Sequence, residues 1–155
     1  MKPANILMSW GAQLMIERPV RKLTVHELIN QLDQSGKLIS ESMASYPDTP
    51  ANRRQLCHII GIERWGQRRL RVALGEPFLT EEYDHYCPSN ERSWDELKAE
   101  WGTTREATLA LANDLTQANL PPDVKVPHNQ FGPLSIKGWL RYLDVHASSE
   151  GKHIK

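Results

Sequence analysis

The end of the chain carries three side chains that could bind a metal ion. Residues 138–155 read "GWLRYLDVHASSEGKHIK", and as one helix they place His146, Glu150 and His153 along a single edge. Neutral imidazole nitrogens and carboxylate oxygens suit a divalent ion such as Zn²⁺, Ni²⁺ or Fe²⁺. Three protein ligands would leave coordination positions open for water, as in catalytic metal sites.

A further candidate ligand, His58, lies in a different predicted helix. At about 100° per residue, His58 falls inside the apolar arc of its helix, and His146 and Glu150 lie beside Trp139 toward the predicted core. A buried imidazole needs a hydrogen-bond partner or a metal. We therefore predict that His58 faces the C-terminal group inside the protein. The alternative is a histidine that is only hydrogen-bonded within the core.

Four segments that must position these side chains carry helix signals. "TVHE" and "SWDE" are capping boxes, and Thr49 and Ser135 are N-cap residues. We predict helices that follow Thr24, run from about Pro50 to Leu74, extend from Ser93 to Asn119, and follow Ser135 to the end. Each has apolar residues at helical spacing, which predicts an all-α bundle because each stripe must pack against another.

The remaining predictions concern the extent of the domain and the residues outside the candidate metal site. We expect one domain over residues 1–155, in which residues 1–22 form an extension packed on the bundle. The segment "DVKVPHNQFGPL" is expected to be mainly a connector, with a short extended piece as an option. His26 is expected to be exposed, and His85 and His128 lie in predicted loops without an assigned role. Glu63 and Arg69 project toward the core, so each needs a partner inside the bundle or must reach its end.

Composition limits the classes of partner. Nineteen basic residues balance nineteen acidic ones, which argues against nucleic-acid binding. The apolar stretch "ANILMSWGAQLMI" is interrupted by polar residues and too short to span a bilayer, so we expect neither a signal peptide nor a membrane anchor. Cys57 and Cys87 lack metal-binding or disulfide-framework spacing, and a cytoplasmic location is the expectation.

Three segments together resemble the DinB-like, or YfiT-like, family of four-helix metalloproteins. They are "LCHIIGIERWGQRRLRVALGEPF", "SWDELKAEWGTTREATLALANDL" and "GPLSIKGWLRYLDVH", and the likeness extends from about Thr24 onward. The resemblance implies an up-down-down-up four-helix bundle and pairing as a homodimer. It also implies a Zn²⁺ or Ni²⁺ ion held by three histidines, one from the second helix, where His58 matches, and two from the last.

The last helix departs from the H-x3-H pair that the resemblance implies. His146 matches the first member, but residue 150 is Glu; with the register set from "KHIK", His153 matches the second member and Ser149 replaces the first. His146 and His153 are separated by about 10 Å of helical rise, which a bend at Gly151 could shorten. Stereochemistry therefore favours Glu150 as the third ligand, whereas the resemblance favours His153.

Two functions are compatible with this sequence. The first, implied by the resemblance, is a metal-dependent enzyme acting on a small molecule, such as a thiol-dependent transferase or a hydrolase. Its metal ligands would be His58, His146 and either Glu150 or His153. The second is a non-catalytic, dimeric helical interaction or stress protein with a degenerate metal site, which the broken ligand spacing favours.

Overall fold

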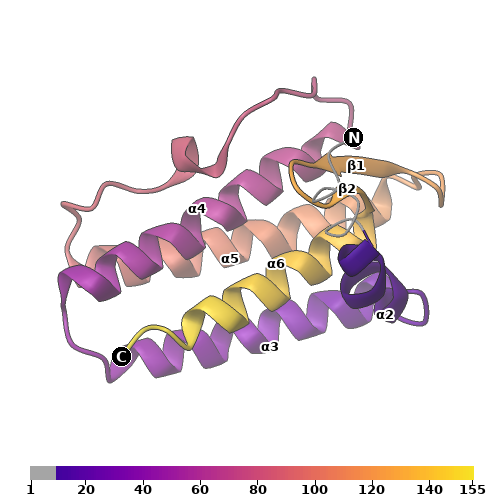
Figure 1. Cartoon of the computed structure of the whole chain (residues 1–155). Coiled ribbons are helices and arrows are strands. Elements are labelled where there is room, and N and C mark those ends of the chain that lie inside the picture. Colours follow the sequence, from indigo (N-terminus) through magenta and orange to yellow (C-terminus); the bar gives the residue numbers. More distant parts are fainter. Residues whose placement is uncertain (1–9) are drawn as a thin grey trace.

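The computed structural model describes residues 10–155, which are mostly helical with one small two-stranded sheet (Figure 1). The elements in chain order are the π-helix η1 (Gln13–Glu17), α2 (Arg18–Val20), α3 (Val25–Ala44), α4 (Pro50–Val72), the 3-10 helix η2 (Tyr83–Tyr86), α5 (Trp94–Gln117), β1 (Lys125–His128), β2 (Gly132–Ser135) and α6 (Ile136–Gly151). The expectation of a predominantly helical protein is confirmed, and the sheet is an addition to it.

The starts of the four long helices are determined by local side chains, as predicted. The Oγ1 atom of Thr24 accepts from the Glu27 N–H at 3.1 Å, and the Glu27 carboxylate accepts from the Thr24 N–H at 2.7 Å. Ser93 and Glu96 form the same reciprocal pair. Caps of this kind satisfy N–H groups that have no partner within the helix. The remaining predicted caps, Thr49 and Ser135, are also present.

The ends of the helices differ from the predictions. Helix α4 ends at Val72, two residues before Leu74, and Gly75 follows with φ +101°. Helix α6 ends at Gly151 and does not continue to Lys155. The N–H groups of residues 152–154 bond three residues back, and the Lys155 N–H bonds to the Asn52 Oδ1 atom at 3.1 Å. The last residues therefore turn away from the helix axis to cover the start of α4.

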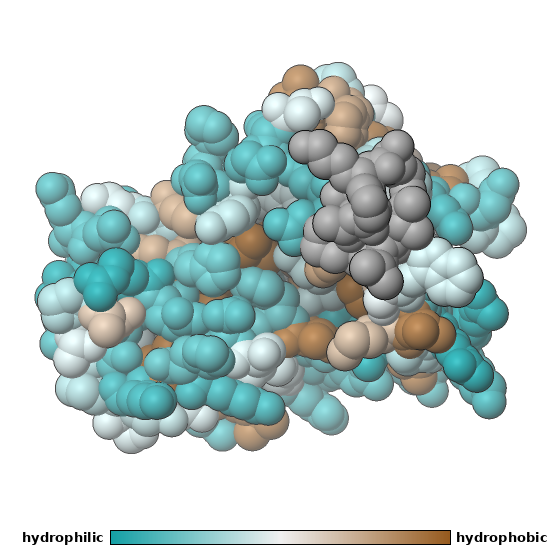
Figure 2. Space-filling view, in the orientation of Figure 1, coloured by the Kyte–Doolittle hydropathy of each residue, from teal (hydrophilic) through white to brown (hydrophobic). Residues whose placement is uncertain are grey.

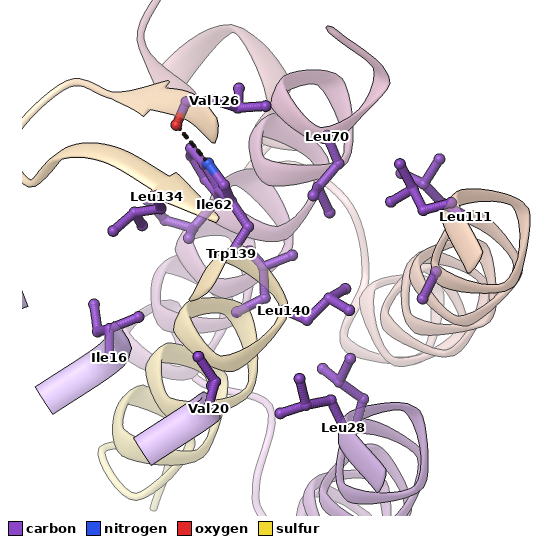
Figure 3. Packing of buried hydrophobic residues seen from close by; sticks show 14 of the residues in the cluster. Ile16, Val20, Leu28, Ile62, Leu70, Leu111, Val126, Leu134, Trp139 and Leu140 are labelled. Carbon is purple, nitrogen blue, oxygen red and sulfur yellow. Dashed lines mark hydrogen bonds between the residues drawn. The ribbon is translucent and has the colours of Figure 1, made fainter. Parts of the chain in front are cut away.

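The four long helices pack around a common core. Helices α3 and α4 each contact both α5 and α6 (Figure 1). Side chains from all four meet in the view of Figure 3, including Leu28, Leu70, Leu111 and Leu140. The apolar stripes of the four helices therefore bury one another.

A buried ion pair crosses this core. The Glu63 carboxylate accepts from the Arg105 Nε at 2.7 Å and Nη2 at 2.9 Å. The Arg105 Nη1 atom also donates to the Leu32 carbonyl at 2.7 Å and to Ser35 at 2.9 Å. The prediction that Glu63 needs a partner inside the bundle is confirmed, and the network links α3, α4 and α5.

The segment predicted to be mainly a connector, with a short extended piece as an option, forms a β-hairpin of two paired strands. Strands β1 and β2 are antiparallel, with Lys125 opposite Ser135 and His128 opposite Gly132. Val126 and His128 are buried, while the residues between and before them are exposed. The Trp139 indole N–H of α6 donates to the Val126 carbonyl at 2.9 Å (Figure 3). This bond fixes the hairpin on the end of α6.

The long connection between α4 and α5, residues 73–93, is bonded to the rest of the protein at several points, and one backbone carbonyl accepts three of these bonds. The Glu81 oxygen accepts from the Trp65 indole, from the Arg69 guanidinium and from the Asn129 amide, each at 3.1 Å. Arg69 also donates to the Pro127 carbonyl and to the Asn129 side chain. Arg69 thus has the interior partners that the sequence analysis requires, all of them neutral oxygens.

The described part of the N-terminal extension packs on α6. Ala12, Ile16 and Val20 are buried, and the Glu17 carboxylate accepts from the Ser135 N–H at 2.7 Å and from its hydroxyl at 2.9 Å. Residues 1–9, the rest of the predicted extension, lie outside the described residues. Trp10, Leu14 and Met15 are exposed, although hydrophilic residues predominate on the face drawn in Figure 2.

Within residues 10–155, every helix is either too short or too polar to cross a lipid bilayer.

Candidate functional site

Two of the predicted ligands meet between α4 and α6. The ring centroids of His58 and His146 are 5.1 Å apart, with an angle of 57° between the ring planes. Both side chains are half-buried. With Zn–N bonds of about 2.0–2.1 Å in tetrahedral geometry, two imidazole ligands of one ion have ring centres roughly 5 Å apart. The separation of this pair therefore fits a shared ion.

The surroundings of His146 favour the neutral form of its imidazole, which is the form that binds metals. Burial, helped by the neighbouring imidazole of His58, lowers the pKa of His146 from 6.5 to about 4, although Glu150 acts in the opposite direction. His146 is therefore neutral at pH 7. A neutral imidazole can offer a ring nitrogen to a metal without first losing a proton.

The other two predicted ligands are placed differently. The Glu150 carboxylate, one helical turn beyond His146, accepts from the Gln55 side-chain amide at 2.7 Å. His153 is exposed in the turn after α6. Within residues 10–155, no three His, Cys, Asp or Glu side chains are grouped closely enough to hold a metal. The residues thus fit a metal ion in part: two imidazoles converge, and a third donor is not in position beside them.

Two tyrosines border the imidazole pair. The Tyr83 ring, from η2, is 5.1 Å from the His58 ring at 84°, and the Tyr142 ring is 5.9 Å from the His146 ring. Burial is the main cause that raises the pKa of both phenols, so both remain protonated at pH 7. One of these rings belongs to the α4–α5 connection and the other to α6.

His128, which received no role from the sequence, is a central part of the aromatic surroundings. Its ring stacks on Phe131 at 4.5 Å and lies 4.7 Å from Tyr142. Its Nδ1 atom accepts from the backbone N–H groups of Gln130 and Phe131 at 3.1 and 3.3 Å. The proton is therefore on Nε2, which is buried and finds no hydrogen-bond partner among the described residues.

Burial, followed by the charges of Arg69 and His146, lowers the pKa of His128 to about 4. One sequence signal could have identified His128. It lies two residues after Val126, and side chains at this spacing share one face of a half-buried strand. The Trp65 and Trp139 rings pack against His128, each with its ring centroid 5.1 Å from that of the imidazole. These two tryptophans, from α4 and α6, therefore hold the His128 ring of the hairpin beside the site.

The two imidazoles border separate cavities. His146 lines a groove of about 460 Å³ between α6 and residues 11–16. His58 lines a smaller cavity of about 280 Å³ together with Tyr83, Cys57 and Cys87. Burial raises the pKa of both thiols, so neither is activated as a nucleophile at neutral pH.

Comparisons with protein-family models, with curated proteins and with solved structures find no match. The function of the chain is therefore inferred from the chemistry of His58, His146 and the groups around them.

Proposed function

We propose that the protein binds a divalent metal ion, Zn²⁺ or Ni²⁺, through His58 and His146 and is an enzyme that acts on a small molecule with its help. The observation that carries the proposal is the convergence of two imidazoles, from two different helices, with ring centroids 5.1 Å apart. When bound, such an ion would supply Lewis-acid activation of a water or thiol, as in a hydrolase or a thiol-dependent transferase.

Glu150 is the preferred third ligand in this proposal, with His153 as the alternative. Positions 146 and 150 are one helical turn apart and face the same side of α6. The Glu150 carboxylate already has one acceptor oxygen oriented by Gln55. A change of its side-chain rotamer is a smaller movement than the rebuilding of the turn that carries His153.

The proposal extends to the architecture. We assign the chain to the DinB-like family, with its four long helices in up-down-down-up order and with homodimer formation. The support is the alternation of one short and one long connection: residues 45–49 join α3 to α4, whereas residues 73–93 join α4 to α5. A long connection has the reach to return along the bundle, so that α4 and α5 run in the same direction.

Metal binding tests the proposal directly. Isothermal titration of tag-free protein with Zn²⁺ and Ni²⁺ should give a stoichiometry near one per chain, and either His58→Ala or His146→Ala should weaken binding at least tenfold. His26→Ala, which removes an exposed imidazole on α3, is the matched control and should leave the affinity unchanged. Equal affinities for His58→Ala and His26→Ala would refute the site.

The third ligand is tested by two further variants. Glu150→Gln should weaken metal binding about tenfold to a hundredfold, the range expected for loss of a ligand or of its support. His153→Ala should behave as the unchanged protein, because His153 is exposed beyond the end of α6. The reverse order of effects would make His153 the ligand.

A second function remains: a non-catalytic, dimeric helical interaction protein whose metal site has degenerated. The observation that favours it is the lack of a three-donor group within residues 10–155. It predicts that chelator treatment leaves the melting temperature unchanged and that added Zn²⁺ does not raise it. A metal-dependent rise, lost in His58→Ala, would exclude this function.

A further inference from the structure

The groove along α6 has the size and position of a ligand-binding site. Its volume of about 460 Å³ lies within the range of roughly 300–1,000 Å³ that is usual for small-molecule pockets. One wall is α6 and the opposite wall is formed by residues 11–16, with Phe131 of the hairpin at the rim. His146 lines it, so a ligand in the groove would lie beside the proposed metal site.

The α6 wall consists of two parallel rows of side chains. Residues four apart on a helix lie on the same face, and the rows are Arg141, Val145, Ser149 and Tyr142, His146, Glu150. From Arg141 to Glu150 the helix rises about 13 Å. The groove is therefore elongated along α6, with His146 near its middle.

The remaining wall is apolar. Ala12, Met15 and Ile16 line it, and Val145 of α6 and Phe131 at the rim add apolar surface. Met15 is 73% exposed and Val145 is 42% exposed, which leaves apolar surface available to a ligand. An apolar molecular body would cover these side chains and remove them from water.

The charges of the groove are at opposite ends. Arg141 donates through Nε to the Met15 carbonyl at 3.2 Å, and the ion pairs formed within residues 10–155 do not include Arg141. The Glu150 carboxylate, at the other end, is bonded to a neutral amide. A ligand carboxylate would pair with the guanidinium and be repelled by Glu150.

We infer that this groove binds a small carboxylic acid with an apolar body, its carboxylate at Arg141 and its other end at His146. The part of the inference that makes such an acid the substrate of the enzyme rests on the proposed function. As a statement about binding, it needs no metal ion.

Isothermal titration of the metal-free protein, residues 1–155, with decanoate, decanol and decylammonium tests the inference. Decanoate should bind saturably and at least tenfold more tightly than the other two. Arg141→Gln should weaken decanoate about tenfold and leave decanol unchanged, and Arg54→Gln, an exposed arginine outside the groove, is the control. Equal affinity for the three probes, or no saturable binding of decanoate, would overturn the inference.

A variant that fills the groove tests the location. A Cβ added at Gly11 meets no heavy atom within 4 Å among the described residues, so Gly11→Phe can enter the groove without a clash at the backbone. It should weaken decanoate and decanol by at least tenfold; if it does not fold, Ser149→Phe blocks the opposite wall. Unchanged binding in a folded blocking variant would overturn the location.

Two controls distinguish ligand binding in the groove from metal binding and from occupation of the groove by a second copy of the chain. His58→Ala should lose the metal and keep decanoate, so that failure of metal binding and failure of ligand binding are read independently. Light scattering should show that decanoate does not change the oligomeric state. A dimer that dissociates as decanoate binds would assign the groove to a second copy of the chain and overturn the inference.

Discussion

The imidazoles of His128 and His146 are held in their neutral form by the folded structure. The pKa of each is lowered from 6.5 to about 4, mainly by burial. In the unfolded chain each would bind a proton near pH 6.5, whereas in the folded protein each does so only near pH 4. Because the unfolded state binds more protons between these values, stability rises with pH in this window.

Stability should therefore fall as the pH is lowered from about 6.5 toward 4. Each histidine contributes at most roughly 3 kcal/mol, since one pKa unit corresponds to about 1.4 kcal/mol. Urea unfolding at several pH values measures the slope. His128→Asn keeps an acceptor near the position of Nδ1 but cannot titrate, so its slope should be smaller. An identical slope in this variant would contradict the assignment to His128.

The sequence predicts which way some of the buried polar side chains point, but it does not predict their partners in other elements. The inward directions of His58 and His146 follow from helical periodicity, which depends only on spacing along one helix. The burial of Glu63 follows in the same way, but its partner Arg105 does not, because that contact depends on how α4 and α5 align. His128 was missed because its strand is only four residues long.

At the scale of the elements, one glycine determines how closely α4 and the connection that follows it approach each other. A Cβ added at Gly61 of α4 would lie 2.3 Å from the Cys87 sulfur and 3.3 Å from the Cys87 Cα atom. The connection between α4 and α5 therefore lies directly on the helix backbone at this point. The same contact positions η2, and with it the Tyr83 ring beside His58.

Gly61→Ala should destabilise the protein even though alanine is the better helix former. The clash displaces the connection, and overpacking of this kind costs typically about 1–3 kcal/mol. Gly102→Ala is the matched control: the added Cβ has open space among the described residues, so the variant should gain about 0.5–1 kcal/mol. The melting temperatures of the two variants and of the unchanged protein measure these effects. A stabilising Gly61→Ala would contradict the close approach.

The boundaries of the helices were predictable where local chemistry sets them. Thr24 and Ser93 specify their helix starts through residues three positions later. The end of α6 was predicted too far along the chain, because the bond between Lys155 and Asn52 joins residues 103 positions apart. The hairpin was underestimated for a similar reason: its support, Trp139, belongs to the following helix.

Across the whole molecule, the Glu63–Arg105 pair fixes the alignment of the bundle. Both side chains are nearly inaccessible to solvent, and Arg105 also bonds to the Leu32 carbonyl and Ser35 of α3. An ion pair in such surroundings is costly to break, because removal of one partner leaves a buried charge without compensation.

Arg105→Met should therefore destabilise the protein by about 3–5 kcal/mol. The exposed pair Arg53–Asp48 provides the control, since Asp48→Asn removes an ion pair that water screens and should cost far less than Arg105→Met. The double variant Glu63→Gln, Arg105→Met should lose less than the sum of its single changes. Denaturant unfolding of these variants, with Glu63→Gln alone, is compared with that of the unchanged protein. Additive losses would mean that the two groups act independently.

The three bonds to the Glu81 carbonyl have a consequence for motion. Because Trp65, Arg69 and Asn129 all donate to this one oxygen, they release together when residues 73–93 lift from the bundle. Deuterium uptake by this connection and by the hairpin amides should then share one protection factor, below that of the interior of α5. Such a partial opening would uncover His58 further while the rest of the protein stays native, because Tyr83 of this connection lines the smaller cavity together with His58.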